Sequence, residues 1–120
     1  MKLIQVACAA VAFVATGVAP LHFAGPQSEP RRIDITARKY GFEPNQITLK
    51  EGEPVTLVLK SADVPHGLKF RELNIDVKAG KGKTGEVEFT PEKAGDFEGH
   101  CSVFCGVGHG SMSVTLHVVE

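Results

Sequence analysis

The sequence predicts an all-β domain, a sandwich or barrel, preceded by an N-terminal hydrophobic leader. Three observations predict this fold. Past residue 30, apolar and polar residues alternate in short runs, which is the period of a half-buried strand. Glycine and proline separate these runs at roughly regular spacing, as in sandwiches and barrels. The same region sustains no 3.6-residue period, which argues against helices.

The predicted leader covers residues 1–26. Lys2 is the only charged residue before Glu29, and residues 3–19 are mostly apolar. A charged start, an apolar centre and small residues toward the end are typical of a secretory signal peptide. The apolar stretch is also close to the ~20 residues that a spanning helix needs, so a single N-terminal membrane anchor is the alternative. Either way, we expect the following domain to be exported: periplasmic, or anchored to the membrane and facing outward.

Residues 27–32 are expected to link the leader to a domain covering 33–120. Strands are expected at 33–37 and 46–50, which alternate on either side of a turn at 40–45, and at 55–59, which is apolar and β-branched. A short strand is expected at 74–77, before the glycine-rich loop 80–85. The last two strands are expected at 86–90, which alternates until Pro91, and at 114–119, which alternates to the C-terminus.

Composition excludes some classes of function. The chain has 120 residues and a net charge of −1, which fits one small domain and argues against a nucleic-acid binder. Charge is nevertheless uneven, because residues 60–83 hold six bases and three acids while 86–98 hold five acids and one base. Such a polarity can orient a partner, although most charge runs are solvated surface.

The segment 101–112 carries the chemistry. Cys101, Cys105, His109 and Met112 follow one another at steps of four, four and three residues. Three interspersed glycines favour a compact loop over a helix. His66 lies 35 residues upstream, after the strand expected at 55–59, and a sandwich can bring that strand end beside the loop.

Thiolate, thioether and imidazole together favour copper in an exported domain. Both sulfurs can bridge two copper ions, with one histidine on each. Met112 then serves one metal as a weak ligand, and the backbone carbonyl of Val103 serves the other. Sharing one electron over two metals and two sulfurs lowers the reorganisation that accompanies electron transfer.

Three other interpretations remain open. Cys101 and Cys105 can form a disulfide, which is the ordinary state of a cysteine pair outside the cytosol. Zinc is a second possibility, although common zinc spacings differ and zinc gives Met112 no role. Met112 can also be core filler. Of the remaining histidines, His100 and His117 are expected at the surface and His22 lies in the leader.

The segment CSVFCGVGHGSM resembles the binuclear copper (CuA) loop of cytochrome c oxidase subunit II, and nitrous oxide reductase carries a similar loop. The surrounding pattern resembles cupredoxins at residues 41–44, 50–52, 63–67 and 89–95. The resemblance implies a cupredoxin-like Greek-key β-sandwich with copper at one end. By position, it implies the ligands His66, Cys101, Cys105, His109 and Met112, with the carbonyl of Val103.

Departures from the subunit II pattern refine this expectation. Val103 replaces the glutamate between the cysteines, so no magnesium site is expected. The chain has no tryptophan, whereas the oxidase family receives electrons through a tryptophan-containing region, and it has one hydrophobic segment where many subunit II proteins have two. These differences favour a small free-standing or singly anchored cupredoxin.

The predicted function is therefore an exported carrier that passes electrons through two copper ions. The expected partner is a redox protein such as a c-type cytochrome or a terminal oxidase, with no nucleic acid and no small-molecule substrate. No catalysis is expected unless the chain is a subunit of a haem–copper oxidase. The alternative is a periplasmic copper-binding module that delivers metal for oxidase assembly.

Overall fold

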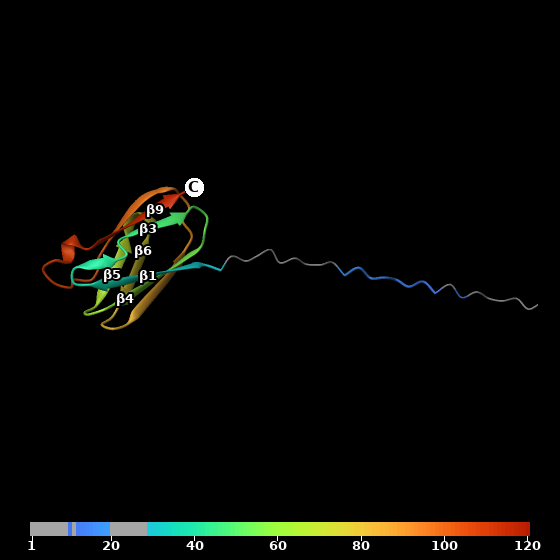
Figure 1. The fold of residues 1–120 in the computed structure, drawn as a ribbon, viewed down its shortest axis with the longest axis horizontal. Coiled ribbons are helices and arrows are strands. Elements are labelled where there is room, and N and C mark those ends of the chain that lie inside the picture. The colour runs from blue at the N-terminus through green and yellow to red at the C-terminus, as the bar shows by residue number, and fades with distance from the viewer. Residues whose placement is uncertain (1–9, 11, 20–28) are drawn as a thin grey trace, which may run out of the picture.

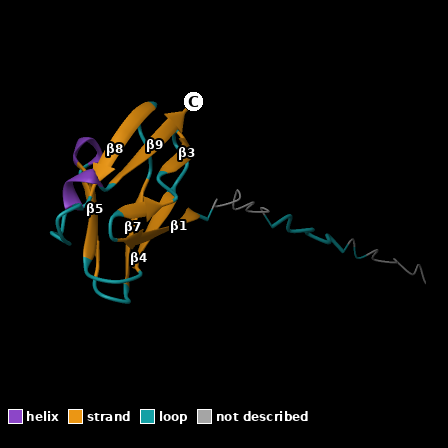
Figure 2. Cartoon of the chain, turned by 60° about the vertical axis from the view of Figure 1, so that its left-hand side comes forward, coloured by secondary structure: helices purple, strands orange, loops and turns teal. Residues whose placement is uncertain are grey.

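The computed structural model describes residues 10, 12–19 and 29–120. Within 29–120 the chain folds into two β-sheets packed face to face (Figure 1). Strands make up most of this part, and helix is limited to two short 3₁₀ turns, η1 (Arg71–Leu73) and η2 (His109–Ser111) (Figure 2). The all-β sandwich that the alternation predicts is confirmed.

The chain switches repeatedly between the two sheets, as expected for a Greek-key sandwich. One sheet has the order β2-β1-β4-β7 and the other the order β3-β9-β8-β5-β6. The strands are β1 (Arg31–Arg38), β2 (Gly41–Glu43), β3 (Gln46–Lys50), β4 (Val55–Ser61), β5 (His66–Phe70), β6 (Ile75–Ala79), β7 (Thr84–Phe89), β8 (Gly95–His100) and β9 (Ser113–Val119).

The core lies between the sheets and is built from the alternating apolar residues. In β1, Ile33, Ile35 and Ala37 are buried while Asp34 faces solvent. The strands β3 and β9 alternate in the same way, whereas β4 is buried along most of its length. The sequence prediction for these strands is therefore confirmed, with ends that differ by a few residues.

Three strands were not expected from the sequence. The short β2 lies inside the predicted turn region. The strand β5 shows no alternation because four of its five residues are buried. In β8, Gly99 resembles a turn residue, yet it is required because Phe70 of β5 packs against its backbone: a Cβ at Gly99 would lie 2.6 Å from Phe70 Cε1.

The two ends of the sandwich differ in content. The loop from Cys101 to Met112 joins β8 to β9 at one end, which we call the metal-site end. The opposite end holds the β3–β4 turn, where Arg31 N donates to Pro54 O and Glu51 N donates to Val119 O. The strand β1 therefore enters the domain away from the 101–112 loop.

The leader falls mostly outside the described residues, which omit 1–9, 11 and 20–28. Residues 10 and 12–19 form no helix or strand. Among the residues that the structure describes, no helix is long and apolar enough to cross a membrane. The signal peptide and its alternative as an anchor therefore stay predictions. The linker predicted at 27–32 ends two residues earlier, because Arg31 and Arg32 belong to β1.

Candidate metal centre

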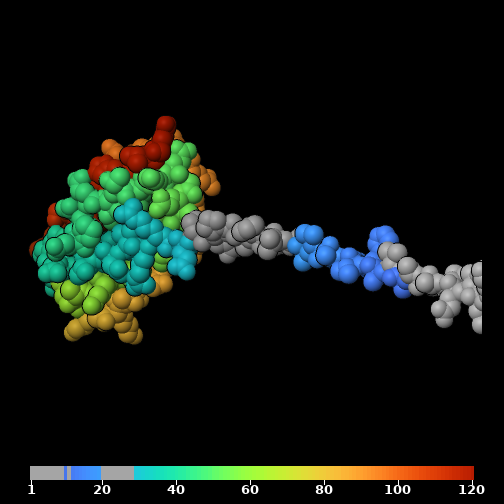
Figure 3. All heavy atoms as spheres, turned by 45° about the vertical axis from the view of Figure 1, so that its right-hand side comes forward, coloured from blue at the N-terminus to red at the C-terminus, as the bar shows by residue number. Residues whose placement is uncertain are grey.

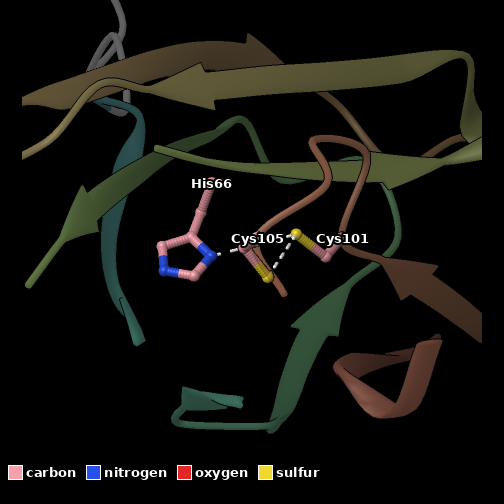
Figure 4. A group of neighbouring side chains, drawn as sticks. All are labelled: His66, Cys101 and Cys105. Atoms are coloured by element: carbon pink, nitrogen blue, oxygen red, sulfur yellow. Dashed lines mark hydrogen bonds between the residues drawn. The ribbon is translucent and has the colours of Figure 1, made fainter. Parts of the chain in front are cut away.

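Pairing between β5 and β8 brings the two ligand-bearing segments together. His66 is the first residue of β5, and Cys101 directly follows β8. Lys69 pairs with His100 across the two strands, and Ser102 N donates to Gly67 O. As a result, His66 Nδ1 lies 3.9 Å from Cys101 Sγ although the residues are 35 positions apart (Figure 4).

The remaining predicted site residues converge on the same point. The sulfurs of Cys101 and Cys105 are 4.0 Å apart. Cys105 Sγ lies 3.8 Å from His109 Nδ1 and 3.3 Å from Met112 Sδ. The carbonyl oxygen of Val103 lies 3.2 Å from Cys101 Sγ. Every residue of the predicted ligand set thus has a donor atom within 4 Å of one of the two sulfurs.

The cluster is buried except on one side. His66 and Met112 are fully buried, and the two cysteines nearly so. His109 is half-buried, and its ring centroid lies 5.7 Å from that of Phe104, which is exposed. His109 is therefore the least buried of the histidine, cysteine and methionine side chains in the cluster.

The two thiols are free in this structure, since a disulfide requires an S–S distance of about 2.05 Å. Burial raises the pKa of the Cys105 thiol, and the neighbouring Cys101 sulfur adds to the effect. A bound cation reverses this preference because a coordinating thiol loses its proton.

The donor set fits a soft metal. A separation of 4.0 Å between the sulfurs lets a single ion lie within ordinary metal–thiolate distance, about 2.3 Å, of both of them. His66, Cys101 and Cys105 each offer a ligand atom, and these atoms all lie within 4.8 Å of one another. Two thiols, two imidazoles and a thioether favour copper over the hard cations.

Asp63 is a further residue of the candidate site, which the sequence pattern did not single out. Its Oδ1 accepts a hydrogen bond from His66 Nε2 at 2.6 Å, which leaves Nδ1 facing the sulfurs. The amides of Lys39 and Val64 also donate to this carboxylate. The Lys39 amide is the largest cause that lowers the pKa of Asp63 to about 2. The available signal was an acid three residues before the candidate ligand His66.

Tyr40 is a second residue that was missed. Its ring lies against the backbone of Gly106 and Gly108, so side chains at these two positions would overlap it. Gly106 also has a φ of +137°, which other residues rarely adopt. These two glycines therefore let the Tyr40 ring pack directly on the loop backbone, in addition to allowing the loop to turn.

The other histidines lie outside the cluster. His100 is exposed and lies 3.7 Å from Glu98. His117 is half-buried on the outer face of its sheet, where its ring nitrogens lie 2.7 Å from Asp96 Oδ1 and from Gln46 Oε1. His22 lies outside the described residues.

The chain matches known proteins over most of its length. The family model for the cupredoxin-like domain matches residues 5–114. Cytochrome c oxidase subunit 2 of Thermus thermophilus is 31% identical over 88 residues, which make up 73% of this chain and 65% of that protein. The chain therefore spans less than two thirds of this relative.

Solved structures share the fold. A chain of a heme-copper terminal oxidase dimer superposes with a TM-score of 0.68 at 29% identity, covering 78% of this chain and 68% of that one. The metal binding domain of the Cu(I)-exporting P-type ATPase CopA of Streptococcus pneumoniae, solved with Cu(I), gives a TM-score of 0.61 at 27% identity. It covers 74% of this chain and 85% of that one. The chain is thus homologous to oxidase subunit 2, and its cysteine–histidine cluster is compatible with a copper site.

Proposed function

The chain belongs to the cupredoxin-like family, and from this premise we propose that it is an exported electron-transfer protein with a binuclear copper site. The observation that carries the proposal is the pair of buried thiols 4.0 Å apart with a histidine nitrogen beside each sulfur. A mononuclear copper site of the blue electron-transfer type uses only one thiolate. The paired arrangement therefore supports two ions that share both sulfurs.

Each residue has a defined role in this proposal. Cys101 and Cys105 would hold the two ions through their thiolates. His66 would be a ligand from the interior, and His109 would be a ligand near the surface. Two weaker donors remain, the Met112 thioether near Cys105 and the Val103 carbonyl near Cys101.

The bound ions supply one-electron redox chemistry. The protein contributes a stiff frame, because His66 starts β5 and the other five donors lie in the 101–112 loop, which is bonded to β5 through Ser102 N and Gly67 O. Cys101 N donates to Met112 O, and this bond closes the loop at its base. Ligands held in this way move little when the charge of the site changes. The half-buried edge of His109 is the proposed point of electron entry or exit.

Electron paramagnetic resonance of the copper-loaded full chain tests the proposal. We expect two copper ions per chain and hyperfine structure from two equivalent copper nuclei. Cys101→Ser and Cys105→Ser should each abolish this spectrum, whereas Cys8→Ser, in the predicted leader, should leave it unchanged. An unpaired electron coupled to only one copper nucleus contradicts the binuclear site.

Delivery of copper to an oxidase is a second candidate function. It is favoured by the structural similarity to the metal binding domain of a Cu(I) exporter. A delivery module would hold Cu(I) on the same ligands without cycling. Tight copper binding without electron exchange with a c-type cytochrome would support delivery, and rapid exchange supports electron transfer.

The location and the partner follow from the same reasoning. A signal peptide or anchor in residues 1–26 places the domain in the periplasm or at the outer side of the membrane. The partners that fit such a site are a c-type cytochrome and a terminal oxidase. Co-purification with a haem–copper protein tests whether the chain works as an oxidase subunit or as a free carrier.

A further inference from the structure

We propose that the metal-site end of the domain is a docking surface for a redox protein whose own contact surface is acidic. The inference rests on the proposed electron-transfer function and goes beyond it by specifying the charge of the partner. It is carried by the position of six cations around the loop that holds the ligands.

We call these six cations the basic rim. All of them are exposed, and they are Arg38, Lys39, Lys60, Lys78, Lys81 and Lys83.

Strand pairing places the rim beside the metal site. Lys78 pairs with Gly67, the residue after the candidate ligand His66. Lys60 is at the end of β4, and the next residue, Ser61, donates its amide to Lys83 O. The turn that carries Lys81 and Lys83 projects from the body of the domain (Figure 3).

The other two rim residues reach the site from β1. Lys39 N donates to Asp63 Oδ2, and Asp63 in turn holds His66. Arg38 is the last residue of β1 and pairs with Gly41.

Three acids lie among or beside these cations and leave an excess of positive charge. Asp63 turns its carboxylate inward to His66 and two backbone amides. Asp76 lies 3.9 Å from Lys78 and accepts a hydrogen bond from Ser102. Glu43 is exposed on β2. The pocket beside Cys101 and Ser102 adds two cations, Lys69 and Arg71, and two acids, Glu72 and Glu98, whose charges cancel. The six rim cations against the three other acids therefore leave this end with a net positive charge.

The centre of the proposed surface is uncharged and partly apolar. No charged residue occurs from Cys101 to Met112. At the tip of this loop Val107 is 98% exposed and Phe104 is 78% exposed, beside the half-buried His109. A neutral, partly apolar patch bordered by one sign of charge is suited to transient docking, because the charges steer the encounter and the patch provides the contact.

The position of the rim favours a protein over an anionic membrane. The strand β1 enters the domain at the opposite end, where Arg31 N donates to Pro54 O. Glu51 N donates to Val119 O and Gly52 N to Pro91 O, so this end holds the acids Glu51, Glu92 and Glu120 together with Lys50 and Lys93. If residues 1–26 anchor the chain, which is the alternative to a signal peptide, the chain enters the domain at the end opposite the rim. A partner with acidic groups around its redox centre can reach both the rim and the edge of His109.

Calorimetric binding to the copper-loaded full chain tests the proposal. The probes are one acidic and one basic c-type cytochrome, each mixed with the chain in the same oxidation state so that no electron moves. The test variant is Lys81→Glu/Lys83→Glu at the rim. The matched control is Lys50→Glu/Lys93→Glu at the opposite end, which changes the net charge by the same amount.

We expect the acidic cytochrome to bind more tightly than the basic one, and binding to weaken with added salt. The rim variant should lose at least about tenfold in affinity for the acidic cytochrome, while the control keeps its affinity within about twofold. Equal losses in the two variants, or tighter binding of the basic cytochrome, overturn the proposal. So does binding of phosphatidylglycerol vesicles through these lysines without binding of the acidic cytochrome.

This experiment separates the docking surface from the proposed function. Binding that depends on the rim, without electron exchange when one partner is reduced, supports the docking surface and contradicts electron transfer. Electron exchange that is equally fast in the rim variant and the control supports electron transfer and overturns the docking surface.

Discussion

The carboxylate of Asp63 accepts a 2.6 Å hydrogen bond from Nε2 of His66, and this bond determines which ring nitrogen faces the thiols. His66 is fully buried, so its ring has no competing contact with solvent. Because Nε2 donates its proton to Asp63, Nδ1 keeps a free electron pair. This nitrogen lies 3.9 Å from Cys101 Sγ. Asp63 is therefore a positioning residue for the candidate ligand.

Replacing this carboxylate should weaken metal binding. Asp63→Asn removes the negative charge that aligns His66, and we expect the affinity for copper to fall by about 10- to 100-fold. A competition titration against a chelator of known affinity measures the change. Asp96→Asn is the matched control, because Asp96 contacts His117 at 2.7 Å on the outer face of the sheet. Equal effects from both variants would show that Asp63 has no special role in positioning.

Substitution of Met112 tests whether its side chain binds copper or only packs in the hydrophobic core. It is fully buried with its sulfur 3.3 Å from Cys105 Sγ. Met112→Leu conserves volume and should cost the metal-free protein less than about 1.5 kcal/mol of unfolding free energy. If the thioether binds a copper ion, the same variant changes the reduction potential and the copper spectrum. An unchanged potential and spectrum with two ions bound would assign Met112 to the core alone.

Tyr40 should order the loop that carries the ligands. Its ring covers the backbone of Gly106 and Gly108, whose carbonyls accept the amides of His109 and Ser111. Tyr40 is 41% exposed, so Tyr40→Ala should lower the unfolding free energy by about 2 kcal/mol, roughly half the loss of a fully buried aromatic. Amide hydrogen exchange at His109 and Ser111 should become faster. Tyr40→Phe keeps the ring and should preserve both properties; exchange unchanged by Tyr40→Ala would contradict the covering role.

Local sequence was sufficient to predict the strands that alternate regularly and the candidate ligands in the 101–112 loop. The strands β1, β3 and β9 alternate along the chain, so their buried faces can be predicted without knowing their neighbours. The candidate ligands were found because thiol, imidazole and thioether side chains are rare and occur here within twelve residues. Their convergence in the structure required only that His66 begin a strand beside β8.

The residues that were missed depend on contacts between distant segments. Asp63 acts through the orientation of its carboxylate, which spacing alone does not give. Tyr40 comes from the β1–β2 connection and reaches a loop more than sixty positions away. The strand β8 was hidden because Gly99, which faces Phe70 of another strand, resembles a turn residue when it is considered by itself.

The contact between Gly99 and Phe70 should be required for the β5–β8 pairing that holds His66 beside Cys101. A Cβ at Gly99 would lie 2.6 Å from Cε1 of the fully buried Phe70, so Gly99→Ala should lower the unfolding free energy by about 1–3 kcal/mol through overpacking. Overpacking against Phe70 should also shift β5 away from β8, which should displace His66 and weaken copper binding. Chemical denaturation and the chelator competition measure these two effects.

Gly41→Ala is the matched control for this prediction. Gly41 also lies in a strand, but a Cβ there meets no atom within 4 Å, so stability should stay within about 0.5 kcal/mol of the original. If Gly99→Ala is as well tolerated as Gly41→Ala, Phe70 adjusts freely and β5 does not depend on this contact. Loss of stability without loss of copper affinity would mean that His66 moves together with the 101–112 loop. The register of β5 against β8 would then not set the geometry of the site.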